Sequence, residues 1–278
     1  MNRTPTIARV FQYTALGLFI VFLGFPFVWL ISTAFKSDRE LNSLGVHLIP
    51  TQPTLDNFVQ ALESQGLVQA AVNSIVVSLA TTLVVVLVSV PGAYVMARYR
   101  GKIRAAGVGW ILVSQIIPVP IIIIPMFFIL RAMGLFDSLG GLGIVYVVYS
   151  LPFALWMLQG YVAGIPVDIE EAAAIDGAGR LRVLRSVVLP LLRPGLIATA
   201  IFTFVSAYNE FFFALVLLQS SEKYTLSVAL STFVNGQGIS LIGPLAAGAL
   251  LASIPSIIFF AILQRRLTGG MLAGAVKG

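Results

Sequence analysis

The chain has 278 residues, 58% of them hydrophobic and 10% charged, with a formal net charge of +6 and no cysteine. This composition excludes a soluble domain and indicates a polytopic membrane protein. Because the positive charges lie in short loops between apolar runs, they fit a membrane topology signal and argue against nucleic-acid binding. The lack of cysteine excludes disulfides and thiolate metal sites, and we expect no metal site of another kind.

Six apolar stretches follow one another along the chain. Each is long enough to cross about 30 Å of hydrocarbon at about 1.5 Å per residue. The first stretch lacks a small-x-small cleavage site, so we expect it to be retained as a span. The sequence therefore predicts an all-α fold with a single transmembrane domain over residues 1–278. The expected spans are residues 13–34, 71–97, 105–130, 144–162, 196–218 and 241–263.

The third expected span carries three prolines, Pro118, Pro120 and Pro125. Each proline removes a backbone donor and clashes with the preceding turn, so we expect this helix to be kinked. The freed carbonyls need partners from neighbouring helices or from a water-filled cavity, which favours a place inside the bundle. A packing kink with no solute contact is the alternative.

Between the fourth and fifth spans, residues 168–195 form a charged stretch that must lie outside the lipid. Asp168 is expected to cap a helix, with Glu171 reaching back to it in a capping box. Gly177 is expected to end that helix, because glycine readily takes the left-handed backbone of a helix C-terminus. A second short helix is predicted over residues 180–188.

The positive charges also predict an orientation. The N-terminal segment, the loop at 98–104, the stretch at 168–195 and the C-terminal tail together hold 13 Lys and Arg residues, and the other three loops hold 4. The side of a membrane protein that is richer in Lys and Arg faces the cytoplasm. We therefore expect both termini and the 168–195 stretch to be cytoplasmic.

The 168–195 stretch contains Glu171-Ala172-Ala173, then three residues, Gly177, nine residues, and Val187-x-Leu189-Pro190. This spacing resembles the EAA signature of importer-type ABC transporter permeases, with Val187 where the family usually has isoleucine. In that family the loop forms a coupling helix that docks into a cleft on a cytoplasmic ATPase. The resemblance implies this role for Glu170, Glu171, Ala172, Ala173, Asp176, Gly177, Leu189 and Pro190. An ordinary amphipathic surface hairpin is the alternative.

Two further segments are similar to carbohydrate importer permeases. Ala207-Tyr208-Asn209-Glu210-Phe211 resembles their Trp-Asn-Glu-Phe segment, with Tyr208 in place of tryptophan. The ending Gly274-Ala275-Val276-Lys277-Gly278 resembles that of the second membrane subunit of maltose-like sugar importers. This likeness implies that Gly274 and Lys277 contact the ATPase, and the glycines favour an extended tail over a helix.

The resemblance implies a type I ABC importer permease for a sugar in the cytoplasmic membrane of a bacterium or archaeon. The implied partners are a second permease subunit forming a heterodimer, a cytoplasmic ATPase dimer that binds ATP and magnesium, and an extracytoplasmic solute-binding protein. The sequence contains no GxxxxGK[ST], HExxH or GxSxG motif. The chain itself is therefore expected to be no enzyme and to bind no cofactor.

Two alternatives for the solute and the mechanism stay open. The same machinery can serve a polyol or glycerol phosphate, and a secondary transporter using Glu210 as a proton relay is a weaker alternative, since such carriers usually hold several intramembrane charges. An ionised Glu210 within a span costs roughly 3 kcal/mol or more, so we expect it to face the interior and pair with a polar group on a neighbouring helix. With Gln115, Tyr208 and Asn209, it forms the candidate solute path.

Overall fold

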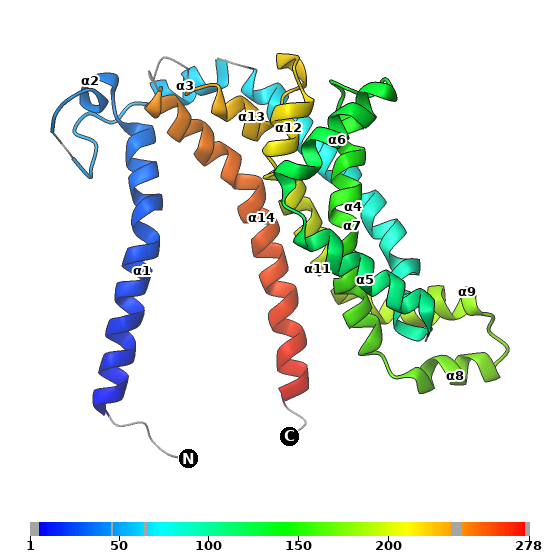
Figure 1. The fold of residues 1–278 in the computed structure, drawn as a ribbon. Helices are drawn as coiled ribbons and strands as arrows, with labels where there is room; N and C mark the ends of the chain where they lie inside the picture. Colours follow the sequence, from blue (N-terminus) through cyan, green and yellow to red (C-terminus); the bar gives the residue numbers. More distant parts are fainter. Residues whose placement is uncertain (1–5, 46, 64–65, 100, 235–240, 276–278) are drawn as a thin grey trace. The chain divides into compact units, whose positions relative to one another are not determined.

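The structure is a computed structural model, and it describes residues 6–45, 47–63, 66–99, 101–234 and 241–275. Within these ranges the chain is built of helices and contains no β-strand (Figure 1). The helices divide into two compact units. One comprises Met1–Leu67 and Leu230–Ser253, and the other comprises Val68–Ala229 and Ile254–Gly278.

The first unit contains a long apolar helix, α1 (Thr6–Phe35), followed by α2 (Asp38–Leu41), α3 (Asp56–Glu63) and the first part of α14 (Ile242–Ala275). The buried side chain of Asn57 ties α3 to the end of α1 by donating to the carbonyls of Ala34 and Lys36 at 3.0 and 2.7 Å. Gly243, the second residue of α14, lies against this amide, and a Cβ at this position would collide with the Asn57 Oδ1.

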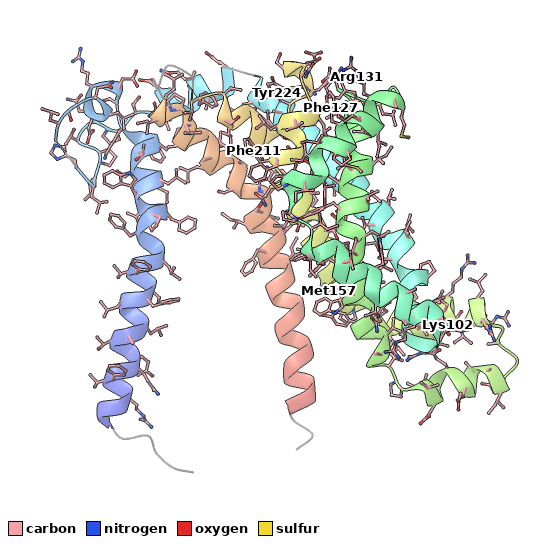
Figure 2. The ribbon with its side chains drawn as sticks, viewed as in Figure 1. Lys102, Phe127, Arg131, Met157, Phe211 and Tyr224 are labelled. Atoms are coloured by element: carbon pink, nitrogen blue, oxygen red, sulfur yellow. The ribbon has the colours of Figure 1, made fainter. Side chains whose placement is uncertain are left out.

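Most of α1 is an exposed apolar surface. None of the residues in its most hydrophobic window is buried, and Figure 2 shows side chains projecting from it along its length. Phe11 is 74% exposed and Phe22 is 76% exposed. A surface this apolar and this long needs a cover of lipid or of another helix.

The second unit is a helical bundle around α7. Besides the part of α14 from Ile254 onward, its helices include α4 (Leu67–Arg98), α5 (Lys102–Ile116), α6 (Val119–Ala132), α7 (Leu139–Ala163), α8 (Val167–Ile175), α9 (Arg180–Val183), α10 (Leu189–Leu191), α11 (Arg193–Tyr208), α12 (Phe212–Leu217) and α13 (Leu226–Ser231). Its largest core cluster joins α4, α6, α7, α11 and α12 through residues such as Val77, Ile123 and Tyr146. Phe127, Phe211 and Tyr224, which are labelled in Figure 2, pack against this cluster.

Four helices or helix segments of the described chain are long and apolar enough to cross a membrane: Arg9–Phe35, Leu67–Arg98, Leu139–Ala163 and Ile242–Ile262. Two bent pairs, Arg104–Ile116 with Val119–Ala132 and Arg180–Leu191 with Arg193–Tyr208, raise the number to six if each pair makes one span. The sequence expectation of an all-α membrane protein is confirmed, with four to six spans.

The expected third span is two helices, and the predicted kink is confirmed. Helices α5 and α6 meet at 103°. Ile117 ends α5 in an extended conformation with φ −73° and ψ 119°, which is the backbone that a following proline favours. Pro118 itself precedes the first residue of α6.

The expected fifth span, residues 196–218, is also interrupted, and here the prediction of one continuous helix was wrong. Helix α11 ends at Tyr208, and α12 begins only at Phe212. The Glu210 side chain accepts from the backbone amides of Phe213 and Ala214 at 2.9 and 3.2 Å. These bonds satisfy the amides of the second and third residues of α12, so the Glu210 carboxylate caps this helix from the position before its N-cap residue, Phe211.

The C-terminal segment differs from expectation as well. The tail was expected to be extended, but α14 continues through Ala275. Gly274 therefore lies in a helix, and Lys277 lies outside the described residues.

Candidate functional site

The charged stretch between α7 and α11 begins with α8, whose start differs from the prediction. Its N-cap is Pro166, with φ −57° and ψ 132°, and no side-chain hydrogen bond caps the helix. The expected capping box of Asp168 and Glu171 is therefore wrong. Because Pro166 starts the helix earlier, Asp168 lies inside the first turn, where its charge still suits the positive end of the helix dipole.

The end of α8 is as predicted. Gly177 has φ +85°, in the left-handed region. The amide of Ala178 donates to the Ala173 carbonyl and the amide of Gly177 donates to the Ala174 carbonyl, both at 3.0 Å. This pair of bonds is a Schellman motif, which satisfies carbonyls at a helix end.

After Gly177 the chain returns through α9 and a wide π-helical turn, Leu184–Val188, in which the Leu189 amide donates to the Leu184 carbonyl. Pro190 follows this turn and has no amide to donate to the carbonyl four residues before it, which disfavours a regular helix here. Leu189 is half-buried and Pro190 is exposed. The predicted second helix over 180–188 is therefore present, but as a helix of four residues and a wider turn.

One buried ion pair anchors this loop. The Arg98 guanidinium, at the end of α4, donates to the Glu170 Oε1 at 2.7 Å, and the two side chains are 12% and 9% exposed. The Tyr94 hydroxyl donates to the other carboxylate oxygen at 2.8 Å. Arg98 also donates to the carbonyls of Val162 and Ile165, both at 2.9 Å. The Glu170 carboxylate thus fixes α8 to the end of α4, and Arg98 extends the connection to the end of α7 and the residues just after it.

Neighbouring residues on α8 therefore have opposite surroundings. Glu170 faces the bundle, while Glu171 is exposed and has no ion pair or hydrogen bond from its side chain in the part of the chain that the structure describes. Ala173 is half-buried and packs against the small cluster of Ile165, Val183 and Val188. Ala172, Asp176 and Gly177 are exposed, and Ile175 is 87% exposed. An apolar tip beside an unpaired charge is a surface suited to another protein.

A groove of about 490 Å³ lies beside this surface, where α8 and α9 approach the end of α4. Its lining residues include Tyr94, Arg98, Glu170, Glu171 and Arg180. Sequence reasoning missed Arg98 and Tyr94 as partners of Glu170. The available signal was weak, because Arg98 was one of four basic residues at the end of an apolar run and their individual roles were not distinguishable.

The predicted partner of Glu210 is present. The hydroxyl of Tyr146, a buried residue of α7, donates to Glu210 Oε2 at 2.8 Å. The same carboxylate caps α12, so both of its oxygens accept hydrogen bonds. The expectation of a polar partner on a neighbouring helix is confirmed.

The other candidate solute-path residues do not form one group. Gln115 lines a cavity of about 160 Å³, and Tyr208, Asn209 and Glu210 are not among its lining residues. Tyr208 is only 3% exposed. Asn209 donates to the carbonyl of Val205 in its own helix at 2.8 Å. Of the four, only Gln115 lines this particular cavity.

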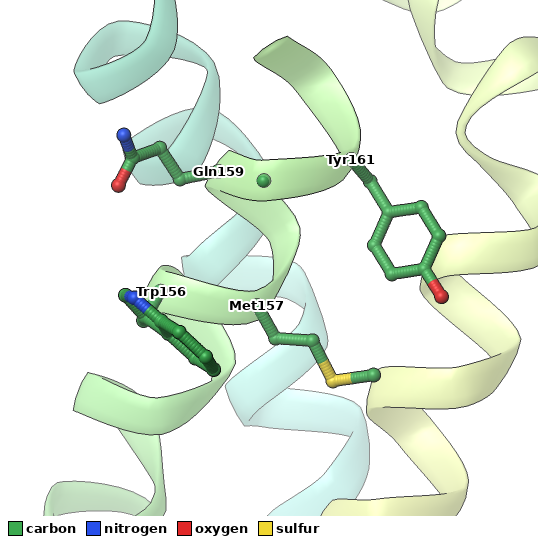
Figure 3. Close-up of a pocket in the computed structure, with 5 residues that line it drawn as sticks. Trp156, Met157, Gln159 and Tyr161 are labelled. Atoms are coloured by element: carbon green, nitrogen blue, oxygen red, sulfur yellow. The ribbon is translucent and has the colours of Figure 1, made fainter. Parts of the chain in front are cut away.

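A larger hollow, of about 460 Å³, is lined by five residues of α7, namely Trp156, Met157, Gln159, Gly160 and Tyr161. Figure 3 shows Tyr161 and Met157 directed toward the neighbouring helix, with Gln159 and Trp156 on the opposite side. This hollow has one amide and no charged side chain. Among the described residues, no group of three or more His, Cys, Asp or Glu side chains is placed to hold a metal ion.

A family model and several known proteins match this chain over most of its length. Residues 89–272 match the family model described as binding-protein-dependent transport system inner membrane component. A protein of Streptomyces antibioticus named as an ABC transporter permease is 55% identical over 229 residues, which are 82% of this chain and 100% of the relative. The diacetylchitobiose uptake system permease protein DasC of Streptomyces coelicolor is 35% identical over 265 residues, 95% of each chain.

A solved structure shares the fold. It is a chain from a bacterial ABC transporter involved in the import of the acidic polysaccharide alginate, with a TM-score of 0.82 and 24% sequence identity. The alignment covers 95% of the present chain and 99% of the other.

Proposed function

Because the chain belongs to the family of inner membrane components of binding-protein-dependent transport systems, we propose that it is one permease subunit of an ATP-binding cassette importer for a sugar. The observation that carries this proposal is the structure of α8, which is fixed to the bundle through Glu170 and unpartnered at its exposed tip. A sugar is favoured as solute because DasC, which aligns over almost the whole chain, is named for the uptake of a saccharide.

The membrane topology that fits this role has six spans. It follows if each of the two bent helix pairs makes one span together with the four long helices. The excess of Lys and Arg on one side supports an orientation with both termini and the 168–195 stretch in the cytoplasm. The whole chain then forms one transmembrane domain. It lies in the cytoplasmic membrane of a bacterium or archaeon.

In this role the exposed residues of α8 dock on a cytoplasmic ATPase. A displacement of α8 by the ATPase is passed to α4 through Arg98 and to α7 through the carbonyls of Val162 and Ile165, because the ion pair and its hydrogen bonds join these three helices. Gly274 and Lys277 at the end of the chain make a second contact with the ATPase. ATP and magnesium belong to that partner.

Two further partners complete the importer. A second permease subunit forms a heterodimer with this chain and covers part of the apolar surface that α5 and α6 leave exposed. A separate solute-binding protein delivers the sugar on the extracytoplasmic side.

The test is uptake by the whole importer reconstituted in lipid vesicles. We expect accumulation of a neutral saccharide to require ATP, the solute-binding protein and the intact ATPase, and to stop when the ATPase carries an inactivating change of its phosphate-loop lysine. Uptake of a polyol or glycerol phosphate in place of every saccharide tried would overturn the sugar assignment. Uptake driven by a proton gradient without ATP would overturn the importer itself.

A further inference from the structure

The cavity beside Gln115 lies where three helices of the second unit meet. Gln115 comes from α5, Tyr149 and Ser150 from α7, and Thr203 and Ser206 from α11. Two phenylalanines, Phe153 and Phe202, complete the lining. Helix α5 ends one residue after Gln115, immediately before the bend at Pro118, so the amide sits at the end of its helix.

The polar side chains around this cavity are available for a ligand. In the described part of the chain, no hydrogen bond engages the side chains of Gln115, Tyr149, Ser150, Thr203 or Ser206. Ser114 and Ser253 differ, because Ser114 already donates to the Ile111 carbonyl at 2.8 Å and Ser253 to the Leu250 carbonyl at 2.7 Å. Around the cavity, five polar side chains of the described chain keep their donors and acceptors available for a ligand.

The aromatic side of the cavity is held in place by its own packing. The rings of Phe153 and Phe202 stack with centroids 4.1 Å apart and an angle of 27° between their planes. The ring of Tyr149 packs edge-on against Phe213, 5.5 Å away. Because these contacts join α7 to α11 and α12, the apolar wall is already in place before a ligand enters.

The chemistry of the lining selects one class of ligand. No charged side chain lines the cavity, so an ionic group would enter without a counter-charge. A sugar ring has C–H faces that pack on aromatic rings and hydroxyls at its edge that bond to amides and hydroxyls. The cavity volume of about 160 Å³ corresponds to roughly five waters at about 30 Å³ each, which suits one ring and not a whole oligosaccharide.

We propose that this cavity is a subsite in which this subunit itself binds one neutral pyranose ring of the transported saccharide. The proposal rests on the function proposed above and extends it, because it gives this chain a direct solute contact. Phe153 and Phe202 form the wall against one face of the ring, and Gln115 with Ser206 bonds to its hydroxyls. The remaining rings of a longer saccharide lie outside the cavity.

The test compares Gln115→Ala and Ser206→Ala with Ser114→Ala and Ser253→Ala in the reconstituted importer. The two cavity changes remove no hydrogen bond within the described chain, so we expect normal assembly and normal stimulation of ATP hydrolysis by the loaded solute-binding protein. Sugar taken up per ATP should fall about three- to tenfold, as for the loss of a hydrogen bond to a bound ligand. The two control serines should leave this ratio unchanged.

Phe202→Leu provides a second measurement, since it keeps an apolar side chain but removes the ring, and it should lower the same ratio. An unchanged ratio in all three cavity variants would overturn the subsite, and so would an equal fall of uptake and ATP hydrolysis, because that indicates general damage. Either result leaves wild-type uptake intact. Failure of the proposed function is a different outcome, in which the unmodified importer takes up no saccharide.

Discussion

A carboxylate with several partners lies near each end of α7, and the two arrangements differ in what they leave exposed. Just before α7, Asp137 accepts hydrogen bonds from the backbone amides of Gln219 and Ser220 at 2.8 and 3.1 Å, and from Lys223 at 3.0 Å. The Ser220 hydroxyl is a further donor. This carboxylate joins two loops of the same chain and has its partners within it.

At the other end, Glu170 is held as firmly, by Arg98 and Tyr94. The next residue, Glu171, has no such partner among the described residues, and the apolar Ile175 is 87% exposed. One face of α8 is thus part of the bundle and the other is exposed. The comparison teaches that a buried, paired charge marks the face by which a loop is fixed, while an exposed, unpaired neighbour marks the face that stays open.

Removing the Glu170 carboxylate should have the largest effect on stability. Glu170→Ala leaves Arg98 buried and without its ion partner, which costs about 3–5 kcal/mol for a buried pair. We expect lower thermal stability in detergent and faster trypsin cleavage near Arg180. Glu171→Ala is the matched control, and equal stability of the two variants would mean that the ion pair does not anchor α8.

The hydrogen bonds of Asp137, at the opposite end of α7, should contribute less to stability. Asp137→Ala removes the acceptor of these hydrogen bonds, but the carboxylate is 20% exposed and water can reach the freed donors, so we expect a loss of about 2 kcal/mol. Lys223→Met should cost less than 1 kcal/mol, because the lysine is 37% exposed. Denaturation in detergent measures both. A larger loss for Lys223→Met than for Asp137→Ala would contradict this order.

The contribution of Asp137 to the free energy of unfolding should also depend on pH. Burial by itself raises the pKa of Asp137, but the hydrogen bonds from Ser220, Gln219 and Lys223 outweigh it and hold the pKa well below its ordinary value. A carboxylate with a lowered pKa stabilises the fold above its unfolded-state pKa of about 3.9 and loses this contribution as the pH falls toward the folded value. The stability difference between wild type and Asp137→Ala should therefore be constant near neutral pH and shrink below about pH 4.

Sequence reasoning succeeded where neighbouring residues decide where a helix begins or ends. The break before α6 follows from Pro118 and the backbone that a proline imposes on Ile117. The end of α8 follows from Gly177, because few residues other than glycine take φ +85° without strain. In both places one or two neighbouring residues decide the conformation, and the sequence shows them.

One failure was local: sequence reasoning placed the start of α8 at Asp168 and overlooked Pro166, two residues earlier. The other failures occurred where the deciding partner is distant in the sequence. The break between α11 and α12 depends on Glu210, whose other partner, Tyr146, lies 64 residues away. The pairing of Glu170 with Arg98, which are 72 residues apart, decides which face of α8 is exposed. Hydrophobic periodicity carries no information about such pairs.

A smaller effect is expected at the turn after α8. Gly177→Val places a β-branched residue at φ +85°, which costs about 1–2 kcal/mol in backbone strain. A Cβ at this glycine meets nothing within 4 Å, so the cost within the chain is strain and not crowding. Gly179→Val is the matched control, because Gly179 has φ −67° and the same open surroundings.

We expect Gly177→Val to reach the membrane at normal levels, to associate weakly with the ATPase and to lose uptake, whereas Gly179→Val keeps its turn. Co-purification of the ATPase and vesicle uptake measure the two properties. Wild-type uptake by Gly177→Val would show that the turn has no part in coupling.

The smallest effect on stability is expected for Glu171→Ala, and this variant separates the two faces of α8 most clearly. Glu171 has no side-chain partner within the described chain, so its removal should change the free energy of unfolding by no more than about 0.5 kcal/mol. If the outer face docks on the ATPase, the same change removes a charge from that interface, and ATPase association should weaken about tenfold or more while thermal stability is unchanged. Glu170→Ala should lose both together, because it releases the whole helix. A Glu171→Ala variant with normal ATPase association would assign the docking surface to the apolar tip around Ile175, and the exposed carboxylate would then be an ordinary solvated charge.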